Sequence, residues 1–259
     1  MSILISSIHY SPIKSLSFES IESCMVKKNL GILNDRIFAF SRIVNAKDNE
    51  LIEKNPNKRN LNNFLTLKNS PSLNKYNFTY KGNKLAITLD GKELISVRAD
   101  DIKQKSLLIK KLVELESALI KPISLLKNNM FPFYDTSHSD KVFNSISLIN
   151  LKSIEDLEKR INKKIEFQRF RGNFYIEGVE PWEERNWIGK TININHTTFK
   201  VEKNIPRCVA INLKPGTDDN GLNLLQSLKK NYNHFDMGIY LRSLNDGEVK
   251  VGNTIEINQ

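Results

Sequence analysis

Residues 169–208 read RFRGNFYIEGVEPWEERNWIGKTININHTTFKVEKNIPRC, and the rest of the chain is organised around this stretch. It opens with two arginines on either side of a phenylalanine and closes with Cys208 directly after Arg207. A guanidinium beside a thiol favours the thiolate, which is the nucleophilic form and a ligand for soft metals. A free cysteine is more often a small buried hydrophobic residue. From the residues alone, both interpretations of Cys208 stay open.

Residues 167–176 alternate in polarity and predict a strand. A period of two would place Arg169, Arg171 and Asn173 on one face of that strand. Burial of two cations and an amide is costly without an anionic partner. This face therefore either points to solvent or meets an anion.

Several short segments stand out along the chain. In the second half they are RFRGN at 169–173, EPWEE at 180–184, WIG at 187–189, PRC at 206–208 and GEVKVGN at 247–253, and in the first half YSPIKS at 10–15, GILNDRIF at 31–38 and FLTLKNSPSL at 64–73. The segments of the second half together resemble the landmarks of the MOSC domain, the module named after the C-terminal part of molybdenum cofactor sulfurases. The earlier segments are similar to the β-barrel domain that precedes many MOSC domains. Four residues, Lys68, Asn150, Gly172 and Arg185, depart from the residues usual in the family.

The resemblance implies a mainly β fold with some α-helix. A β-barrel-like N-terminal domain of residues 1–110 would precede a MOSC β-barrel domain of residues 111–259 with peripheral helices. Local patterns predict individual elements as well, because Asp-Gly between apolar runs favours a hairpin and a repeat of three to four favours a helix. We expect a strand at 3–10, hairpins at 85–97 and 190–203, helices at 103–117, 151–161 and 222–230, and a last hairpin that turns at 252–253.

The resemblance also implies a site for the molybdenum cofactor (molybdopterin) in the cleft between the two domains. Cys208 would be the catalytic residue and would ligate the molybdenum. Asn150 also suits the N-cap of the helix that follows it, which explains that residue equally well. The contacts expected to the pterin or its phosphate are Lys14, Ser15, Arg36, Asn150, Arg171, Asn173 and Arg207.

The two-domain layout resembles the mitochondrial amidoxime-reducing component and its bacterial counterparts. The chain would then be a molybdenum-dependent oxidoreductase that reduces N-hydroxylated (or N-/S-oxide) small molecules. A separate donor protein of ferredoxin, flavodoxin or cytochrome type would supply electrons. The alternative is a sulfur carrier or cofactor-delivery module, in which Cys208 holds a persulfide supplied by a partner desulfurase that uses pyridoxal phosphate. A third interpretation is a binding protein without chemistry.

Composition narrows the function classes further. The chain has 259 residues, a formal net charge of +10 and two cysteines. Two cysteines cannot hold an iron–sulfur cluster or a four-cysteine zinc site within the chain. The basic residues are scattered and accompany no nucleic-acid motif, so we expect no nucleic-acid partner. No run of about 18 apolar residues predicts a membrane span, and the cytoplasm is the expected compartment.

Overall fold

The computed structural model describes residues 2–119, 122–134 and 145–258. Within these residues, seven strands close into a barrel in the order β11-β10-β14-β13-β12-β16-β1, and β1 pairs back onto β11. Strand β2 extends the sheet from β1. The strands are β1 (Ile3–Tyr10), β2 (Glu19–Ile21), β10 (Ile146–Asn150), β11 (Phe174–Glu177), β12 (Thr191–Ile194), β13 (Thr197–Pro206), β14 (Asp236–Ser243) and β16 (Thr254–Asn258).

The barrel is filled by apolar side chains that alternate along its strands. In β14, Ile239 and Leu241 are buried in the barrel core, and in β12 the buried positions are Ile192 and Ile194. Period-two burial of this kind predicts one face toward the barrel interior. A small sheet of β3 (Ser23–Lys27), β4 (Gly31–Ile32) and β15 (Gly247–Lys250) lies beside the barrel.

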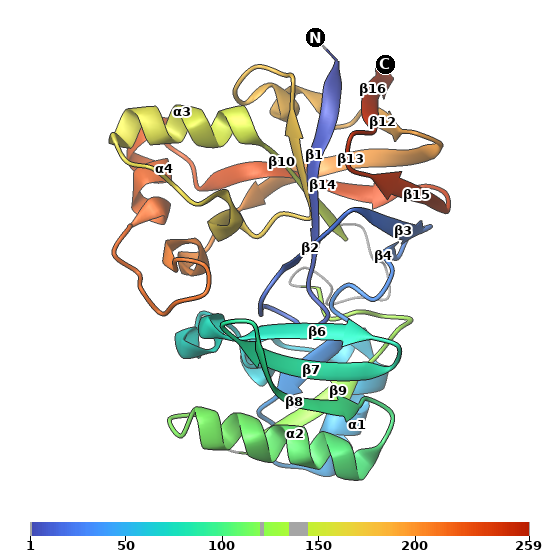
Figure 1. Cartoon of the computed structure of the whole chain (residues 1–259). Helices are drawn as coiled ribbons and strands as arrows, with labels where there is room; N and C mark the ends of the chain where they lie inside the picture. Colours follow the sequence, from blue (N-terminus) through green and yellow to red (C-terminus); the bar gives the residue numbers. More distant parts are fainter. Residues whose placement is uncertain (1, 120–121, 135–144, 259) are drawn as a thin grey trace.

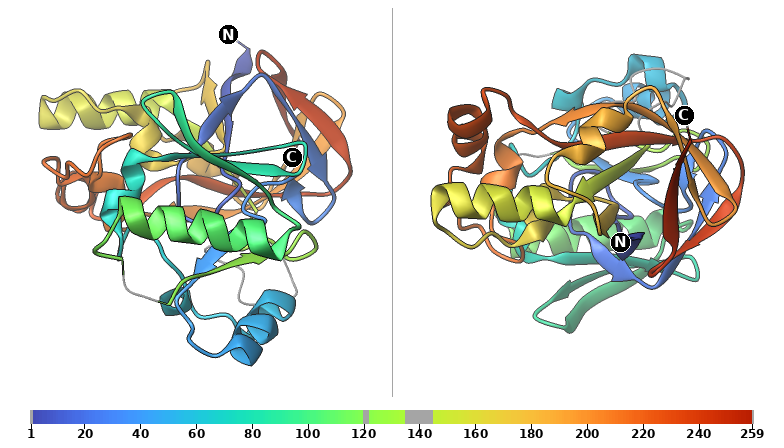
Figure 2. Two further views of the ribbon diagram at one scale, coloured as in Figure 1. Left: turned by 60° about the horizontal axis from the view of Figure 1, so that its bottom comes forward. Right: turned by 90° about the horizontal axis from the view of Figure 1, so that it is seen from above.

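A second lobe lies below the barrel in Figure 1. It has its own apolar core, in which Phe38, Phe40 and Phe78 pack with Leu108 and Leu112 of a helix. That helix, α2, lies next to the sheet formed by residues 77–98 of the same lobe (Figure 2). The elements of this lobe are β5 (Phe38–Ser41), α1 (Ala46–Lys54), β6 (Asn77–Lys81), β7 (Lys84–Leu89), β8 (Lys92–Arg98), α2 (Ile102–Leu115) and β9 (Ser124–Lys127).

Two further helices, α3 (Leu151–Ile161) and α4 (Leu224–Tyr232), lie together on one side of the barrel (Figures 1 and 2). Short 3-10 turns connect the other elements. They are η1 (Pro56–Lys58), η2 (Leu61–Asn63), η3 (Pro71–Lys75), η4 (Phe167–Phe170), η5 (Glu183–Trp187) and η6 (Val209–Asn212). None of the helices in the described segments has both the length and the apolarity to cross a bilayer.

The chain enters the barrel with β1, builds the second lobe, and returns to the barrel at β10. The first strand therefore pairs with β11 and β16, which lie more than half the chain away. A domain boundary near residue 110 remains a prediction. Wherever that boundary is drawn, β1 is a strand of the barrel, because it forms backbone hydrogen bonds with β11 and β16.

The predicted fold class, mainly β with peripheral helices and a barrel, is confirmed. Most of the predicted elements are present as well. The hairpin at 84–98 turns at Asp90 and Gly91, both in the left-handed region, as the Asp-Gly pair predicts. Asn150 caps α3 by accepting a hydrogen bond from Lys152 N.

Two predicted elements are wrong. Residues 167–170 form a 3-10 turn rather than a strand, because Arg169 contacts Glu166 and Arg171 N donates to Gln168 O, and an extended strand cannot make contacts between residues so close in sequence. The last two strands do not form a hairpin: β15 pairs with β3, and β16 pairs with β12 and β1. The turn between them is held instead by β1, where Gly252 N donates to Ile5 O.

Candidate functional site

The loop after β1 carries a lysine into the interior between the two lobes. Lys14 is only 2% exposed, and its Nζ donates to Phe133 O at 3.3 Å and lies 5.8 Å from the ring centre of Phe64. Its backbone N–H donates to Phe38 O at 2.8 Å. Phe133 N in turn donates to Arg36 O at 2.7 Å, so residue 133 connects Lys14 with the turn that holds Arg36.

The carboxylate of Asp35 holds that turn in place through hydrogen bonds and an ion pair. Asp35 is fully buried, accepts hydrogen bonds from Ser11 N at 2.9 Å and Asn173 Nδ2 at 3.2 Å, and forms an ion pair with Arg36. Burial raises the pKa of Asp35, and the Arg36 guanidinium opposes that rise. Three chain segments, near residues 11, 35 and 173, thus meet at one carboxylate.

Arg36 and Arg171 lie against the same aromatic ring. Their guanidinium carbons are 4.9 Å and 4.8 Å from the ring centre of Phe18, a distance at which cation–π attraction operates. Arg171 also donates to Leu16 O, in the loop that carries Lys14. The fold therefore gathers cations from three distant segments around one loop, and such a group suits an anionic ligand.

Strained backbone is concentrated at the same residues. Ser15, Arg36 and Arg171 have φ of 60°, 55° and 52°, the left-handed region that non-glycine residues seldom adopt. In the described part of the chain, the other non-glycine residues with positive φ are asparagines, Asp90 and Trp182. Residues held in such conformations cluster at binding sites, where tertiary contacts stabilise them.

Asn173 locks the segment that presents Arg171. Its Oδ1 accepts from Ser147 Oγ at 2.9 Å and Ser147 N at 3.1 Å, and its Nδ2 donates to His9 O at 3.0 Å as well as to Asp35. Asn173 is 1% exposed. It therefore joins β1, β10 and the Asp35 turn, and acts on the site through these contacts.

Gly172 explains one departure from the family pattern. A Cβ at this position would lie 2.7 Å from Ile149 Cδ1, and the Gly172 N–H donates to Tyr175 Oη at 2.9 Å. A proline, the usual residue of the family, would lose this donor and meet the Ile149 side chain. The backbone here is fixed by packing.

The half-buried Arg207 and the buried Arg169 brace the segment that carries Cys208. Arg207 Nη1 donates to Phe170 O at 2.8 Å, and its Nε donates to Met237 O at 2.9 Å. Arg169 is 3% exposed, pairs with Glu166 at 2.6 Å and donates to Asn212 O at 2.6 Å. The loop of Arg171 and the loop after β13 are thereby held together.

The thiol of Cys208 is exposed, whereas Cys24 is buried. Cys208 begins the turn η6, directly after the braced Arg207. A cavity of about 330 Å³ opens between the lobes nearby. Its walls include Phe18, Arg169, Arg171, Ala210 and Leu213.

Asn150 lies in a different polar cluster. Its Nδ2 donates to Glu180 O at 2.7 Å and to Glu184 Oε2 at 3.1 Å, and its Oδ1 accepts from Lys152 N. The buried Glu184 also accepts from Ser153 Oγ at 3.0 Å, and burial raises its pKa. The amide group of Asn150 thus donates to Glu180 and Glu184 while its oxygen caps α3, and its contact with a phosphate remains a prediction.

The structure thus brings Lys14, Ser15, Arg36, Arg171 and Asn173 together and ties Cys208 to them through Arg207. Sequence reasoning did not assign Phe18 or Asp35 to the site. The adjacent Asp-Arg pair was the one available signal for Asp35. A lone phenylalanine after a loop gives no comparable signal.

Residues 135–256 match the family model of the MOSC domain. That segment of the chain is similar to the MOSC domain, whose family is associated with binding of the molybdenum cofactor. Residues 135–144 of the match lie outside the described residues.

Among curated proteins, this chain is 32% identical over 84 residues to mitochondrial amidoxime reducing component 2 of Rattus norvegicus. The match covers 32% of this chain and 24% of that protein, so it spans about a quarter of the relative's length.

Two solved structures are also similar to this chain. YuaD of Bacillus subtilis has a TM-score of 0.46 with 8% identity, over 99% of this chain and 96% of that one. YiiM of Geobacillus stearothermophilus has a TM-score of 0.36 with 15% identity, over 45% and 55% of the two chains.

Proposed function

We propose that this protein binds the molybdenum cofactor at the junction of its lobes and reduces N-hydroxylated small molecules with it. The observation that carries the proposal is the pair of guanidinium groups on Phe18, next to the segment that ends in an exposed thiol. The short match to an amidoxime reducing component supports the choice of substrate class.

The residues present fit an anionic metal cofactor. Arg36 and Arg171 would hold its phosphate, since each guanidinium group can donate two parallel hydrogen bonds to two phosphate oxygens. The described residues contain no group of three or more His, Cys, Asp or Glu side chains placed to hold a metal ion. A metal would therefore arrive with its organic cofactor, and the Cys208 thiolate would supply a protein ligand to it.

When bound, the cofactor would supply a two-electron redox centre. In the proposed reaction the N–O bond of an amidoxime breaks, the substrate gains two electrons and two protons, and the oxygen leaves as water. A separate donor protein would provide the electrons. The contribution of this chain is to fix the cofactor: Asp35 and Asn173 hold the arginine-bearing turns, and Arg207 holds the thiol-bearing one.

The test is the molybdenum and pterin content of chains purified from a host that makes the cofactor. We expect near-stoichiometric molybdenum and pterin in the native chain. Cys208→Ala should keep pterin and hold its molybdenum less tightly, so that a chelator removes the metal faster than from the native chain, and Arg171→Gln should lose both. Arg98→Gln is the matched control, because Arg98 is exposed and paired with Asp100 in the other lobe. If the native chain contains neither molybdenum nor pterin, the proposal is refuted.

The exposed thiol of Cys208 also supports the sulfur-carrier alternative. In that case a pyridoxal-phosphate desulfurase would leave a persulfide on Cys208. Mass spectrometry of the native chain separates the two functions. A persulfide on Cys208 in a chain free of molybdenum would favour the carrier, whereas bound molybdenum with turnover of benzamidoxime by reduced viologen dye would favour the reductase.

A further inference from the structure

We infer that an electron donor with an acidic surface docks on the face formed by the end of α3, by α4 and by the residues after α4. This inference rests on the proposed function, because only a reductase needs a donor. The face is defined by residues 159–164 and 221–235 together with Val209.

The two segments at the centre of this face carry basic side chains and no acidic ones. Residues 159–164 contain four basic and no acidic side chains, and residues 221–235 contain two lysines and no acidic side chain. Lys159, Lys163 and Lys230 are exposed. The flanking carboxylates are Asp156 and Glu158, which pair with Arg160 at 3.2 Å and Lys164 at 3.1 Å, and the exposed Glu155. They are fewer than the basic side chains of the two segments. A surplus of positive charge therefore faces solvent.

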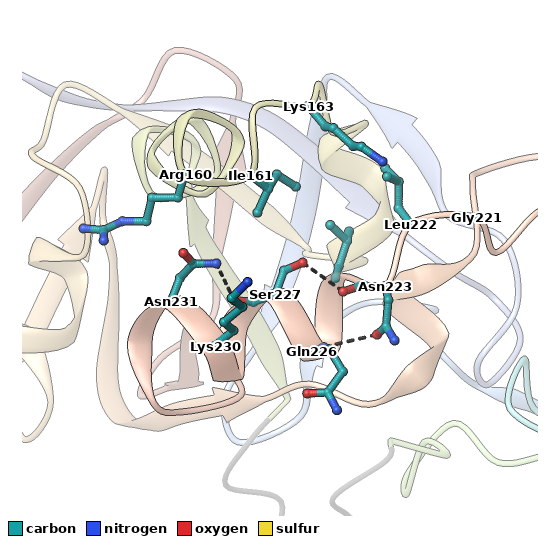
Figure 3. Close-up of a pocket in the computed structure, with 11 residues that line it drawn as sticks. Arg160, Ile161, Lys163, Gly221, Leu222, Asn223, Gln226, Ser227, Lys230 and Asn231 are labelled. Atoms are coloured by element: carbon teal, nitrogen blue, oxygen red, sulfur yellow. Dashed lines mark hydrogen bonds between the residues drawn. The ribbon is translucent and has the colours of Figure 1, made fainter.

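A cavity of about 570 Å³ lies between the two helices (Figure 3). Arg160, Lys163 and Lys230 line it together with the amides of Gln226 and Asn231, and its described walls contain no acidic side chain. These cationic and amide side chains all donate hydrogen bonds, and the cations attract negative charge. The cavity therefore suits the carboxylates of an acidic partner protein. None of these residues belongs to the site of Arg36, Arg171 and Cys208.

The face continues to the thiol. Phe235 is 41% exposed, and its backbone carbonyl accepts from Arg207 N at 3.0 Å, one residue before Cys208. Lys229 Nζ lies 5.6 Å from the centre of the Phe235 ring. Val209, directly after Cys208, is 46% exposed. Lysines around an exposed apolar spot match the anatomy of a protein interface, a polar rim around an apolar centre.

Two further contacts join α4 to the turn that follows Cys208. Leu225 N donates to Asn212 Oδ1 at 3.2 Å, and Asn212 Nδ2 lies 3.3 Å from Asn223 Oδ1. A donor on this face would therefore lie beside the proposed metal ligand. Opposite charges speed association without requiring tight binding, which suits repeated delivery of electrons.

The test is binding of an acidic [2Fe–2S] ferredoxin to the full chain by calorimetry at low ionic strength. We expect saturable binding that weakens with salt, and about a tenfold weaker Kd for Lys163→Glu/Lys230→Glu. Lys103→Glu/Lys110→Glu is the matched control, because it reverses two exposed lysines of α2 in the other lobe. Thermal melts confirm that each variant folds. A second pair, Lys163→Gln/Lys230→Gln, should give an intermediate loss.

A companion assay follows benzamidoxime reduction driven by the ferredoxin or by reduced viologen. Charge reversal should slow the ferredoxin-driven rate and leave the viologen-driven rate unchanged. The docking face is wrong if native chain does not bind the ferredoxin, if charge reversal changes Kd no more than the α2 control, or if duplex DNA binds more tightly at the same salt. Failure of the proposed function is separate: it appears as absence of viologen-driven turnover, and the binding titration still decides the docking face.

Discussion

Substitution of Asp35 gives the sharpest test of how the site is held together. In Asp35→Asn one oxygen remains and can still accept from Ser11 N. The new amide nitrogen would face two donors, Asn173 Nδ2 and the guanidinium of Arg36. Hydrogen bonds to charged groups contribute about 1.5–3 kcal/mol each, and the side chain of Arg36 is 14% exposed, so water recovers part of the loss. We expect the free energy of unfolding to fall by about 3 kcal/mol.

The assay is urea unfolding of the native and variant chains, followed by fluorescence. Asp246→Asn is the matched control. Asp246 also has two polar partners, Lys27 Nζ at 2.7 Å and Lys28 N at 2.8 Å, but its side chain is 54% exposed. Loss of an exposed pair should cost less than about 1 kcal/mol. Equal effects of the two substitutions would refute the claim that the buried carboxylate joins the three segments.

Three further predictions concern other parts of the chain. Burial lowers the pKa of His9 from 6.5 to about 4, so the unfolded chain binds its proton first as pH falls. Stability should decline by about 2 kcal/mol between those two pKa values, and His9→Gln should remove that decline in urea titrations across the window. Gly238 has φ of +80°, and a Cβ there would lie 2.4 Å from Leu148 O. Gly238→Ala should cost about 3 kcal/mol, whereas Gly82→Ala, with φ of +53° and open space around it, should cost about 1 kcal/mol. Equal losses in thermal unfolding would contradict this. Finally, a disulfide reagent should modify Cys208 rapidly in the native chain and spare Cys24, which is buried with a pKa raised to about 12. Cys208→Ala should abolish the rapid phase, and its persistence would show that Cys24 reacts instead.

The elements that could be predicted from the sequence have local signals. Asp90 and Gly91 define their hairpin by backbone preference alone, and Asn150 caps its helix within two residues. The segment 167–173 could not be predicted, because its conformation depends on partners far along the chain. Arg169 is buried by contacts with Glu166 and Asn212, and Arg171 is held by Leu16.

The same division applies to the site. Resemblance nominated Lys14, Arg36 and Arg171 individually, but their convergence depends on closure of the barrel by β1 and β11. Phe18 contacts both arginines, and Asp35 contacts Asn173, only because the barrel closes. Period-two patterns predict strands but do not state which strands pair.

The central claim is that the Cys208 thiolate ligates molybdenum held between the two lobes. X-ray absorption at the molybdenum edge tests it most directly, on native chain and Cys208→Ser purified with cofactor. We predict one sulfur neighbour fewer around the metal in Cys208→Ser, and an unchanged count in a Cys24→Ser control. The same number of sulfur neighbours in native chain and Cys208→Ser would show that Cys208 does not bind the metal and would contradict the account.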